Sequence, residues 1–322
     1  MRLLLLGGPK FLGRAVIDAA LAAGHEPTLF NRGLTGADLY PDVERITGDR
    51  DGGLDGLRGR TWDAVVDTSG YVPRIVGAGA DLLRDAVGHY VFVSSISAYA
   101  SFAERVDERA PVATLDDPSA EDVQAGYGGL KALCEQAVER SFPARATHVR
   151  AGLIVGPHDP TGRFTYWPHR VERGGELLVP GSLDRAIQVV DVRDLAAWLV
   201  RCAEQRTAGT YNATCDTTMR TVLDAAVAET GVQPVFVEVD PAFLVEHEVG
   251  EWLELPVWLD ESQAEWRHFM DVDASAAARA GLAPRPMRET VAATLAEAVT
   301  VEGVGLTPER EAALLDAWHA GA

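Results

Sequence analysis

The chain begins with a run of four leucines that leads directly into a glycine-rich turn. Leu3–Leu6 is a short apolar segment, and Gly7, Gly8 and Gly13 follow it as a helical pattern starts over residues 11–23. A continuous apolar run of this length is typical of a strand that is buried on both faces. We interpret Gly7 as permitting the turn, Gly8 as letting the backbone approach a ligand, and Gly13 as letting helix and strand pack closely. The segment therefore predicts a cradle for a phosphate or pyrophosphate group at a helix N-terminus.

Strand and helix patterns then alternate through the first half of the chain. Further strands are expected at residues 28–30, 44–46, 64–66, 90–93 and 147–150, with helices over 72–86 and 128–141 between them. Such alternation predicts an α/β fold with a doubly wound, Rossmann-like parallel sheet. Ligands of such sheets bind at the carboxyl ends of the strands.

The second half has a different composition, richer in turn formers, acids and tryptophans. We expect a dinucleotide-binding domain over residues 1–155 and a smaller lobe over 156–322 that binds mainly substrate. Residues 187–215 are expected to return to the first domain, with 187–194 joining the main sheet and a helix starting near Leu195. Asp191 and Asp194, which precede Leu195, are expected to cap that helix.

The composition is that of a soluble globular protein. Of the 322 residues 47% are hydrophobic and 24% are charged, and the net charge is −19. This charge argues against binding of nucleic acid through general electrostatics. The three cysteines show no metal-binding spacing, and Leu3–Leu6 is too short for the core of a signal peptide. We therefore expect a cytoplasmic protein with no metal site and no membrane partner.

Tyr127 and Lys131 lie four residues apart in a predicted helix, and Ser95 lies just beyond a predicted strand. Residues at this spacing share one face of a helix. An ammonium group beside a phenol favours the phenolate and lowers the pKa of the tyrosine. Ser95 could polarise a carbonyl or carbinol oxygen, whereas its neighbour Ser94 should face the opposite way. These groups are suited to moving a proton while a cofactor moves a hydride.

Several motifs are shared with one known superfamily. They are Gly7-Gly8-x-x-Phe11-x-Gly13, Gly48-Asp49, Ser95-x-x-x-Tyr99, Tyr127-x-x-x-Lys131, Arg150 with Gly156-Pro157, and Val190-Asp191-Val192-x-Asp194-Leu195-Ala196. With these motifs the chain resembles the extended or atypical short-chain dehydrogenases/reductases of the NAD(P)-dependent epimerase/dehydratase superfamily. The resemblance implies that Ser95, Tyr127 and Lys131 form the catalytic set. In that set Tyr127 is the general acid/base, and Lys131 binds the nicotinamide ribose and lowers the pKa of Tyr127.

Three positions depart from the patterns of this superfamily. Lys10 replaces the usual middle glycine, and it either contacts a phosphate or is solvated. Ile187 occupies the slot of an arginine that grips the diphosphate in nucleotide-sugar enzymes, which weakens a nucleotide-sugar substrate without excluding it. Ile96-Ser97 stands where dehydratases carry an acidic pair, so dehydration is not expected.

The cofactor preference depends on the end of the second strand, where Asn31 and Arg32 replace the carboxylate that selects NAD. Arg32 offers a charged fork for a 2′-phosphate, so NADP(H) is favoured over NAD(H), which stays open. Asp49 either approaches the adenine or caps a turn. The predicted cofactor-binding residues are Gly7, Gly8, Lys10, Phe11, Leu12, Gly13, Asn31, Arg32, Asp49, Thr68, Ser69, Gly70, Tyr127 and Lys131.

We therefore expect an NAD(P)-dependent oxidoreductase or epimerase acting on a hydroxyl or ketone of a sugar-like or other small polar substrate. The predicted substrate residues are Ser95, His158, Arg163, Tyr166 and Trp167. The alternatives are a catalytically silent dinucleotide-binding protein and an RNA-associated protein of the same fold. The resemblance also implies a homodimer formed through the helices at 72–86 and 128–141.

Overall fold

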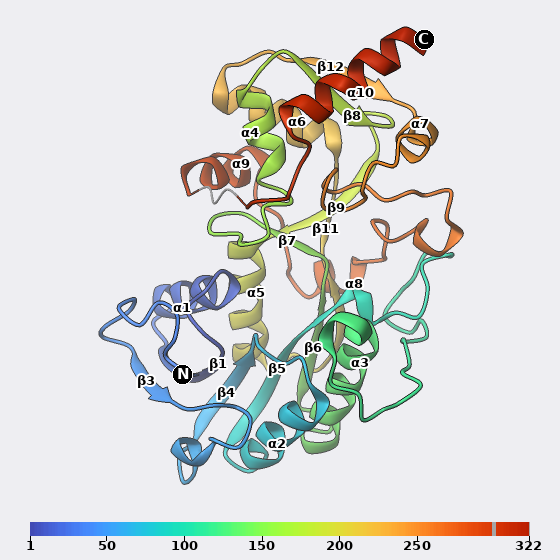
Figure 1. The fold of residues 1–322 in the computed structure, drawn as a ribbon. Coiled ribbons are helices and arrows are strands. Elements are labelled where there is room, and N and C mark those ends of the chain that lie inside the picture. Colours follow the sequence, from blue (N-terminus) through green and yellow to red (C-terminus); the bar gives the residue numbers. More distant parts are fainter. Residues whose placement is uncertain (298–300, 322) are drawn as a thin grey trace.

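The computed structural model, which describes residues 1–297 and 301–321, is built around a seven-stranded parallel sheet (Figure 1). The strand order is β10-β6-β5-β4-β1-β2-β3. The strands are β1 (Arg2–Leu6), β2 (Glu26–Asn31), β3 (Glu44–Thr47), β4 (Trp62–Asp67), β5 (Val87–Ser95), β6 (Ala146–Ala151) and β10 (Gly209–Ala213). The order runs outward in both directions from the neighbours β1 and β4. This confirms the predicted Rossmann-like, doubly wound sheet and sets its switch point between β1 and β4.

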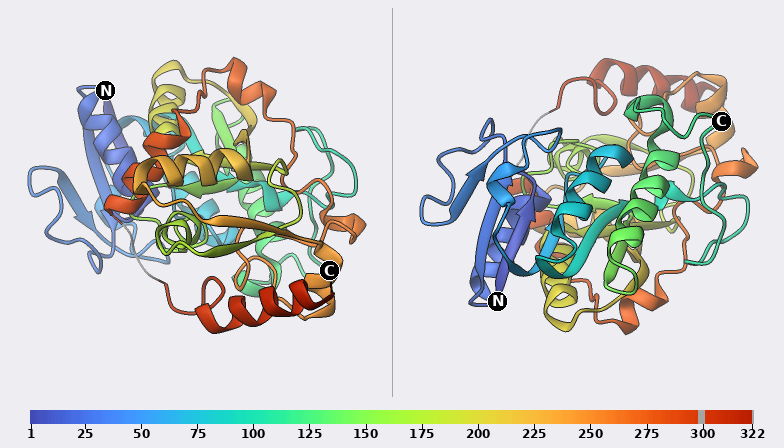
Figure 2. Two further views of the ribbon diagram at one scale, coloured as in Figure 1. Left: turned by 90° about the horizontal axis from the view of Figure 1, so that it is seen from above. Right: turned by 90° about the horizontal axis from the view of Figure 1, so that it is seen from below.

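Pairs of helices cover both faces of this sheet (Figure 2). Helices α1 (Leu12–Ala22) and α5 (Val192–Gln205) pack against each other on one face, and α2 (Pro73–Leu83) and α3 (Val123–Ser141) on the other. Leu3 and Leu5 belong to the core beneath α1 and α5, whereas Leu4 and Leu6 belong to the core beneath α2 and α3. Because successive strand residues face opposite ways, the leucine run fills both layers.

The C-terminal lobe lies above the sheet in Figure 1 and has its own core. Its strands are β7 (Leu153–Val155), β9 (Ala186–Asp191) and β11 (Cys215–Thr218) in one sheet, and β8 (Glu176–Pro180) and β12 (Val235–Val239) in another. Its helices are α4 (Tyr166–Glu172), α6 (Met219–Thr230), α7 (Pro241–Glu246), α9 (Met287–Ala296) and α10 (Pro308–Gly321). A short helix, α8 (Ser275–Arg279), returns to pack beside β10.

The expectation that residues 187–194 join the main sheet is wrong. Strand β9 pairs in parallel with β7 and antiparallel with β11, and the seventh strand of the main sheet is β10 instead. The chain leaves the main sheet at Gly152, between β6 and β7, so β9 finds its partner outside that sheet. The apolar run of β9 is buried in the lobe as it would be in the main sheet, and its pattern therefore does not distinguish the two.

Helix α5 does return to the main sheet, but it begins at Val192, earlier than expected. Asp191 caps it, because its side chain accepts a hydrogen bond from the backbone N–H of Arg193 at 2.8 Å. Asp194 has a different use, since it binds the Arg285 side chain at 2.7 Å. One of the two predicted caps is thus confirmed.

Candidate active site

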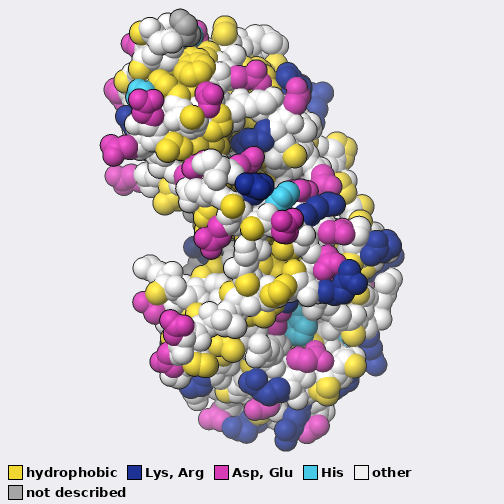
Figure 3. Space-filling view, turned by 90° about the vertical axis from the view of Figure 1, so that its right-hand side faces the viewer, with side chains coloured by type: hydrophobic (Ala, Val, Ile, Leu, Met, Phe, Trp, Pro, Cys, Tyr) yellow, Lys and Arg dark blue, Asp and Glu magenta, His cyan; other side chains and the backbone are white. Residues whose placement is uncertain are grey.

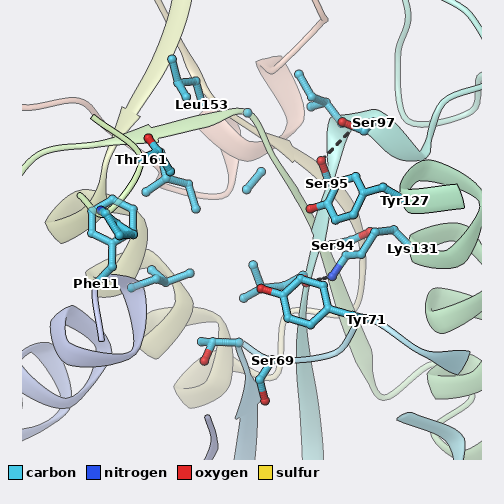
Figure 4. Close-up of a pocket in the computed structure, with 18 of the residues that line it drawn as sticks. Phe11, Ser69, Tyr71, Ser94, Ser95, Ser97, Tyr127, Lys131, Leu153 and Thr161 are labelled. Carbon is cyan, nitrogen blue, oxygen red and sulfur yellow. Dashed lines mark hydrogen bonds between the residues drawn. The ribbon is translucent and has the colours of Figure 1, made fainter. Parts of the chain in front are cut away.

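A single cleft of about 690 Å³ lies at the carboxyl ends of β1, β4, β5 and β6. It runs from the glycine-rich turn after β1 to residues of the C-terminal lobe, and Ser95, Tyr127 and Lys131 all line it (Figure 4). In the space-filling view a notch separates the part that holds the sheet from the lobe above it (Figure 3). The three residues predicted to be catalytic and the glycine-rich turn therefore line the same cleft.

The three glycines of the turn have three different surroundings. Gly7 has a φ of +147°, and a Cβ there would lie 2.3 Å from the Thr68 hydroxyl oxygen. A Cβ on Gly13 would lie 2.1 Å from the backbone oxygen of Gly8, so helix α1 packs directly on the turn. Gly8 lines the cleft, and no heavy atom lies within 4 Å of the position that its Cβ would take. Gly8 thus leaves open space where a ligand can approach the backbone.

The N-terminus of α1 is open to an anion. Its capping residue is Phe11, which has the unusual backbone angles φ 43° and ψ −110° and provides no side-chain cap. The first N–H groups of a helix carry partial positive charge and need an acceptor. Lys10 is exposed and lines the cleft beside them. The turn and the helix start together fit a phosphate or pyrophosphate.

Ser95 and Ser94 point in different directions at the end of β5, as predicted. The Ser95 hydroxyl accepts a hydrogen bond from the backbone N–H of Ser97 at 3.1 Å and lies beside the Tyr127 phenol (Figure 4). The Ser94 hydroxyl donates to Glu135 at 2.5 Å. Ser95 is therefore the serine that faces the phenol.

Close packing of α3 sets the position of Tyr127. The helix begins at Val123, earlier than expected, and Gly126 interrupts it with non-helical angles directly before Tyr127. A Cβ on Gly128 would lie 2.1 Å from the backbone oxygen of Ser97, and one on Gly129 would lie 2.6 Å from a methyl group of a neighbouring leucine. These glycines weaken the helix locally, but they let α3 approach the turn that follows Ser95.

Lys131 lies one turn further along α3 and is only 3% exposed. Its ammonium donates hydrogen bonds to the backbone oxygens of Gly70 and Val93, both at 2.7 Å, and lies 4.5 Å above the centre of the Phe92 ring. Burial lowers its pKa to about 8. Because an ammonium has three N–H donors, one is left for a ligand.

The expectation that Lys131 lowers the pKa of Tyr127 is wrong in this structure. Burial raises the pKa of the phenol, whereas the hydrogen bond with Ser95 and the charge of Arg163 lower it. The reason is that the Lys131 ammonium is turned toward the Gly70 and Val93 carbonyls. Tyr127 is therefore held as a protonated phenol, and Arg163 is the cation that acts on it.

A buried ion pair beneath the cleft was not predicted. The Arg150 guanidinium on β6 donates to both carboxylate oxygens of Glu135, at 3.0 and 2.7 Å, and the same carboxylate accepts from Ser94. Glu135 follows Lys131 by one helical turn, so this pair ties the face of α3 that carries Lys131 to β5 and β6. In the sequence, this pair could have been found from the spacing of four residues between Lys131 and Glu135, which places both on one face of a helix.

The other predicted cofactor residues fall into two groups. Leu12, Thr68 and Ser69 line the cleft. Gly70 does not line it, and its backbone oxygen instead binds Lys131.

The residues predicted to contact the adenosine end also lie outside the lining of the cleft. Asn31 bridges the turn, because its amide donates to the backbone oxygen of Gly7 and accepts from Gly33 N–H. Asp49 caps a turn by accepting from the backbone N–H of Asp51 at 2.9 Å. Arg32 is exposed just after β2. The turn-capping alternative for Asp49 is thus the one that the structure contains.

Of the residues predicted for substrate, Ser95 and Arg163 line the cleft, whereas His158, Tyr166 and Trp167 do not. Trp167 is 1% exposed, and its indole N–H donates to the backbone oxygen of Pro256. Tyr166 packs against it with ring centres 5.0 Å apart, and His158 lies 3.6 Å from Glu297. Helix α4 turns these aromatic groups into the core of the lobe, which corrects the prediction.

Trp252 and Phe269 line the cleft instead. They come from a segment for which the sequence showed only a high tryptophan content. The lining of the cleft also has an unusual charge. It contains Lys10, Lys131 and Arg163 and, among the described residues, no aspartate or glutamate. The whole chain has 48 acidic and 29 basic residues, so the lining of the cleft is positively charged in a protein that is negative as a whole.

No cluster of three or more His, Cys, Asp or Glu side chains that could hold a metal ion occurs among the described residues. Nor does any helix in residues 1–297 and 301–321 have the length and apolar character needed to cross a membrane. On the face seen in Figure 3, basic side chains are interspersed with acidic ones.

Comparison with known proteins agrees with this architecture. The sequence model of the NAD dependent epimerase/dehydratase family matches residues 74–214. No curated protein sequence matches the chain significantly. This match, over part of the chain, agrees with the resemblance seen in the motifs.

Solved structures share the fold over nearly the whole chain. The Bordetella bronchiseptica enzyme WbmH, in complex with NAD+, is 17% identical with a TM-score of 0.65, and the match covers 92% of this chain and 97% of that one. UDP-glucuronic acid 4-epimerase from Bacillus cereus, in complex with NAD, is 13% identical with a TM-score of 0.63, covering 91% and 97%. UDP-glucose 4-epimerase from Thermus thermophilus, in complex with NAD, is 19% identical with a TM-score of 0.62, covering 93% and 100%.

Proposed function

We propose that the protein is an NAD(P)-dependent oxidoreductase or epimerase that acts on a hydroxyl or ketone of a sugar-like or other small polar substrate. The observation that carries this proposal is the single cleft in which Ser95, Tyr127 and Lys131 meet the glycine turn. The match of residues 74–214 to the model of the NAD dependent epimerase/dehydratase family supports a nicotinamide dinucleotide as the cofactor. The similar folds solved with NAD support the same conclusion.

The residues at the turn suit such a cofactor. Gly8 offers open space, the start of α1 has no side-chain cap, and Lys10 adds a positive charge. NADP(H) is the proposed form, because β2 ends in Asn31 and Arg32 follows it, with no carboxylate to repel a 2′-phosphate. Arg32 is exposed and has the planar fork that binds a phosphate well.

A bound nicotinamide would donate or accept the hydride at the reacting carbon. Tyr127 then gives or takes the proton at the reacting oxygen, and its protonated state suits donation to a ketone. Ser95 offers its hydroxyl hydrogen to the same oxygen. Lys131 holds one N–H for the cofactor while two are bound to carbonyl oxygens. In net reduction the hydride passes from the cofactor to the substrate and stays there. In epimerisation the substrate first gives its hydride to the cofactor and becomes a ketone, and the hydride then returns to the opposite face of that ketone.

The two-part organisation is also proposed. Residues 1–152, with α5 and β10, would form the dinucleotide-binding domain, and most of residues 153–322 would bind substrate, since β7 already pairs within the lobe rather than ending the first domain at 155 as expected. The homodimer through α2 and α3 stays a prediction that light scattering in solution can test.

The test is a titration of the purified protein with NADPH and NADH, followed by assays of turnover. Oxidation of sugars and nucleosides with NADP+ and reduction of small ketones with NADPH are measured by NADPH absorbance, and epimerisation of sugars is measured by NMR. The proposal expects binding of both nucleotides, with NADPH tighter, and turnover of at least one carbonyl class. Absence of nucleotide binding at millimolar concentration would contradict it. Tighter binding of NADH would reject only the choice of NADP(H).

A further inference from the structure

The end of the cleft that faces the C-terminal lobe holds one cation, Arg163. Its guanidinium carbon lies 5.1 Å from the centre of the Trp252 ring. Within residues 1–297 and 301–321 its guanidinium has no hydrogen-bonded or ion-paired partner, although its side chain is partly buried. A partly buried arginine with a free fork is suited to a ligand that carries an anion.

Asp159, the acidic side chain whose charge acts on Arg163, has its own hydrogen-bond donors. Asp159 is 2% exposed, and its two oxygens accept from the backbone N–H of Thr161 at 2.8 Å and from the Thr161 hydroxyl at 3.0 Å. The Arg163 charge also reaches Tyr127, since it lowers the pKa of that phenol. An anion bound by Arg163 would therefore lie close to the group that moves the proton.

The Trp252 ring lies beside this cation, and the Phe269 ring lies beside Trp252. Trp252 and Phe269 both line the cleft, and their ring centres are 5.5 Å apart at an angle of 87°. Trp252 has a φ of 63°, a conformation that is rare for a residue with a side chain. Its backbone N–H donates a hydrogen bond to the backbone oxygen of Trp258 at 3.1 Å. Strained backbone of this kind often marks a residue at a functional site, such as one that contacts a ligand. Ile96 and Leu153 add apolar surface to the same cleft.

We propose, on the basis of the function proposed above, that the substrate carries one carboxylate and a ring-shaped or flat apolar body. Arg163 binds the carboxylate, and Trp252 and Phe269 cover the body while the reacting oxygen meets Tyr127. A nucleoside diphosphate carries at least two negative charges, and this end of the cleft supplies one cation. The other two cations of the cleft lie away from Arg163 or are already engaged. Lys10 adjoins the glycine turn, and Lys131 is bound to backbone carbonyls.

Calorimetric titration of the NADPH-saturated protein with three probes tests this inference. Benzoate has a ring and one carboxylate, benzamide is its neutral match, and UDP supplies the diphosphate. We expect benzoate to bind about tenfold or more tightly than benzamide, because hydrogen bonds to a charged group are the stronger ones. We expect UDP to bind more weakly than benzoate.

Variants locate the binding. Arg163→Met should abolish the preference for benzoate, and Arg163→Lys should retain part of it. Arg267→Met is the matched control, since Arg267 is exposed in the same aromatic segment and does not line the cleft. Trp252→Ala should weaken benzoate and benzamide alike, by about tenfold. Binding of NADPH by each variant shows that it is folded.

The outcomes separate the two proposals. Three results would overturn this inference: equal binding of benzoate and benzamide, a preference for benzoate that survives Arg163→Met, or tighter binding of UDP than of benzoate. If the protein still binds NADPH in these cases, the proposed function stays intact. Loss of NADPH binding in the unmodified protein would overturn both.

Discussion

The sheet domain and the C-terminal lobe each bury an arginine–glutamate pair, but the two pairs stand in different relations to the cleft. In the sheet domain, Glu135 lies one helical turn from Lys131 on α3, and its pair with Arg150 on β6 holds α3 against β5 and β6. In the lobe, Glu311 on α10 binds Arg170 at 2.6 Å and Arg173 at 2.9 Å, and does not line the catalytic cleft. The same chemistry thus positions the helix face that carries Tyr127 and Lys131 in one region and fixes a helix in the other.

The largest expected effect concerns the sheet domain. Tyr127→Phe should lower turnover about 10²–10⁴-fold, the usual contribution of a positioned acid/base, without changing the dissociation constant of NADPH. Tyr71→Phe is the matched control, because Tyr71 lines the same cleft and loses only its hydroxyl. Steady-state kinetics and nucleotide titration measure both. Full activity of Tyr127→Phe would remove Tyr127 from the mechanism.

The two glutamates give the sharpest contrast between the regions. Glu135→Gln and Glu311→Gln should each lower the free energy of unfolding by roughly 3–5 kcal/mol, since each leaves a buried arginine without its charge partner. Chemical denaturation measures this loss. Only Glu135→Gln should also lower kcat, because Glu135 positions the Tyr127 face of α3. An equal loss of kcat in both variants would show that the lobe is not separate from the catalytic geometry.

The glycine turn offers a smaller and more local effect. Gly13→Ala should destabilise the fold by about 1–3 kcal/mol, because its Cβ would overlap the Gly8 backbone oxygen. Gly8→Ala should leave the melting temperature almost unchanged, since its Cβ meets no atom within 4 Å. It should still weaken the binding of NADPH, because the new methyl group would occupy the space proposed for the cofactor. Unchanged nucleotide affinity in Gly8→Ala would place the cofactor elsewhere.

The smallest effect is a pH dependence of stability. The pKa of Lys131 is about 8 in the folded protein, below its ordinary value of 10.5, because of burial. Between these values the unfolded state binds more protons, so Lys131 makes the free energy of unfolding rise with pH. The slope should be on the order of 1 kcal/mol per pH unit. Subtracting the same curve for Lys131→Met isolates this contribution, and a flat difference between pH 8 and 10 would contradict the assigned pKa.

The sequence predicted the sheet domain better than the lobe for a physical reason. A parallel strand buried on both faces must be apolar throughout, and glycines must stand where backbone and helix touch, so Leu3–Leu6 and Gly13 carry local evidence of their positions. Tyr127 and Lys131 were also found, because helical spacing brings them to one face.

The lobe depended on contacts that no local pattern encodes. Trp167 follows the turn-rich segment expected to face substrate, yet α4 turns it into the core, and distant Trp252 reaches the cleft. β9 was assigned to the wrong sheet because burial alone does not name a partner strand. The direction of the Lys131 ammonium likewise depends on the Gly70 and Val93 carbonyls, which are remote in sequence.

A crystal structure of the protein soaked with NADPH would show whether the cofactor and Tyr127 meet in the cleft. We expect the pyrophosphate over Gly8 and the start of α1, with the nicotinamide ring within reach of Tyr127. A nucleotide bound elsewhere, or a nicotinamide on the far side of the cleft from Tyr127, would contradict this expectation.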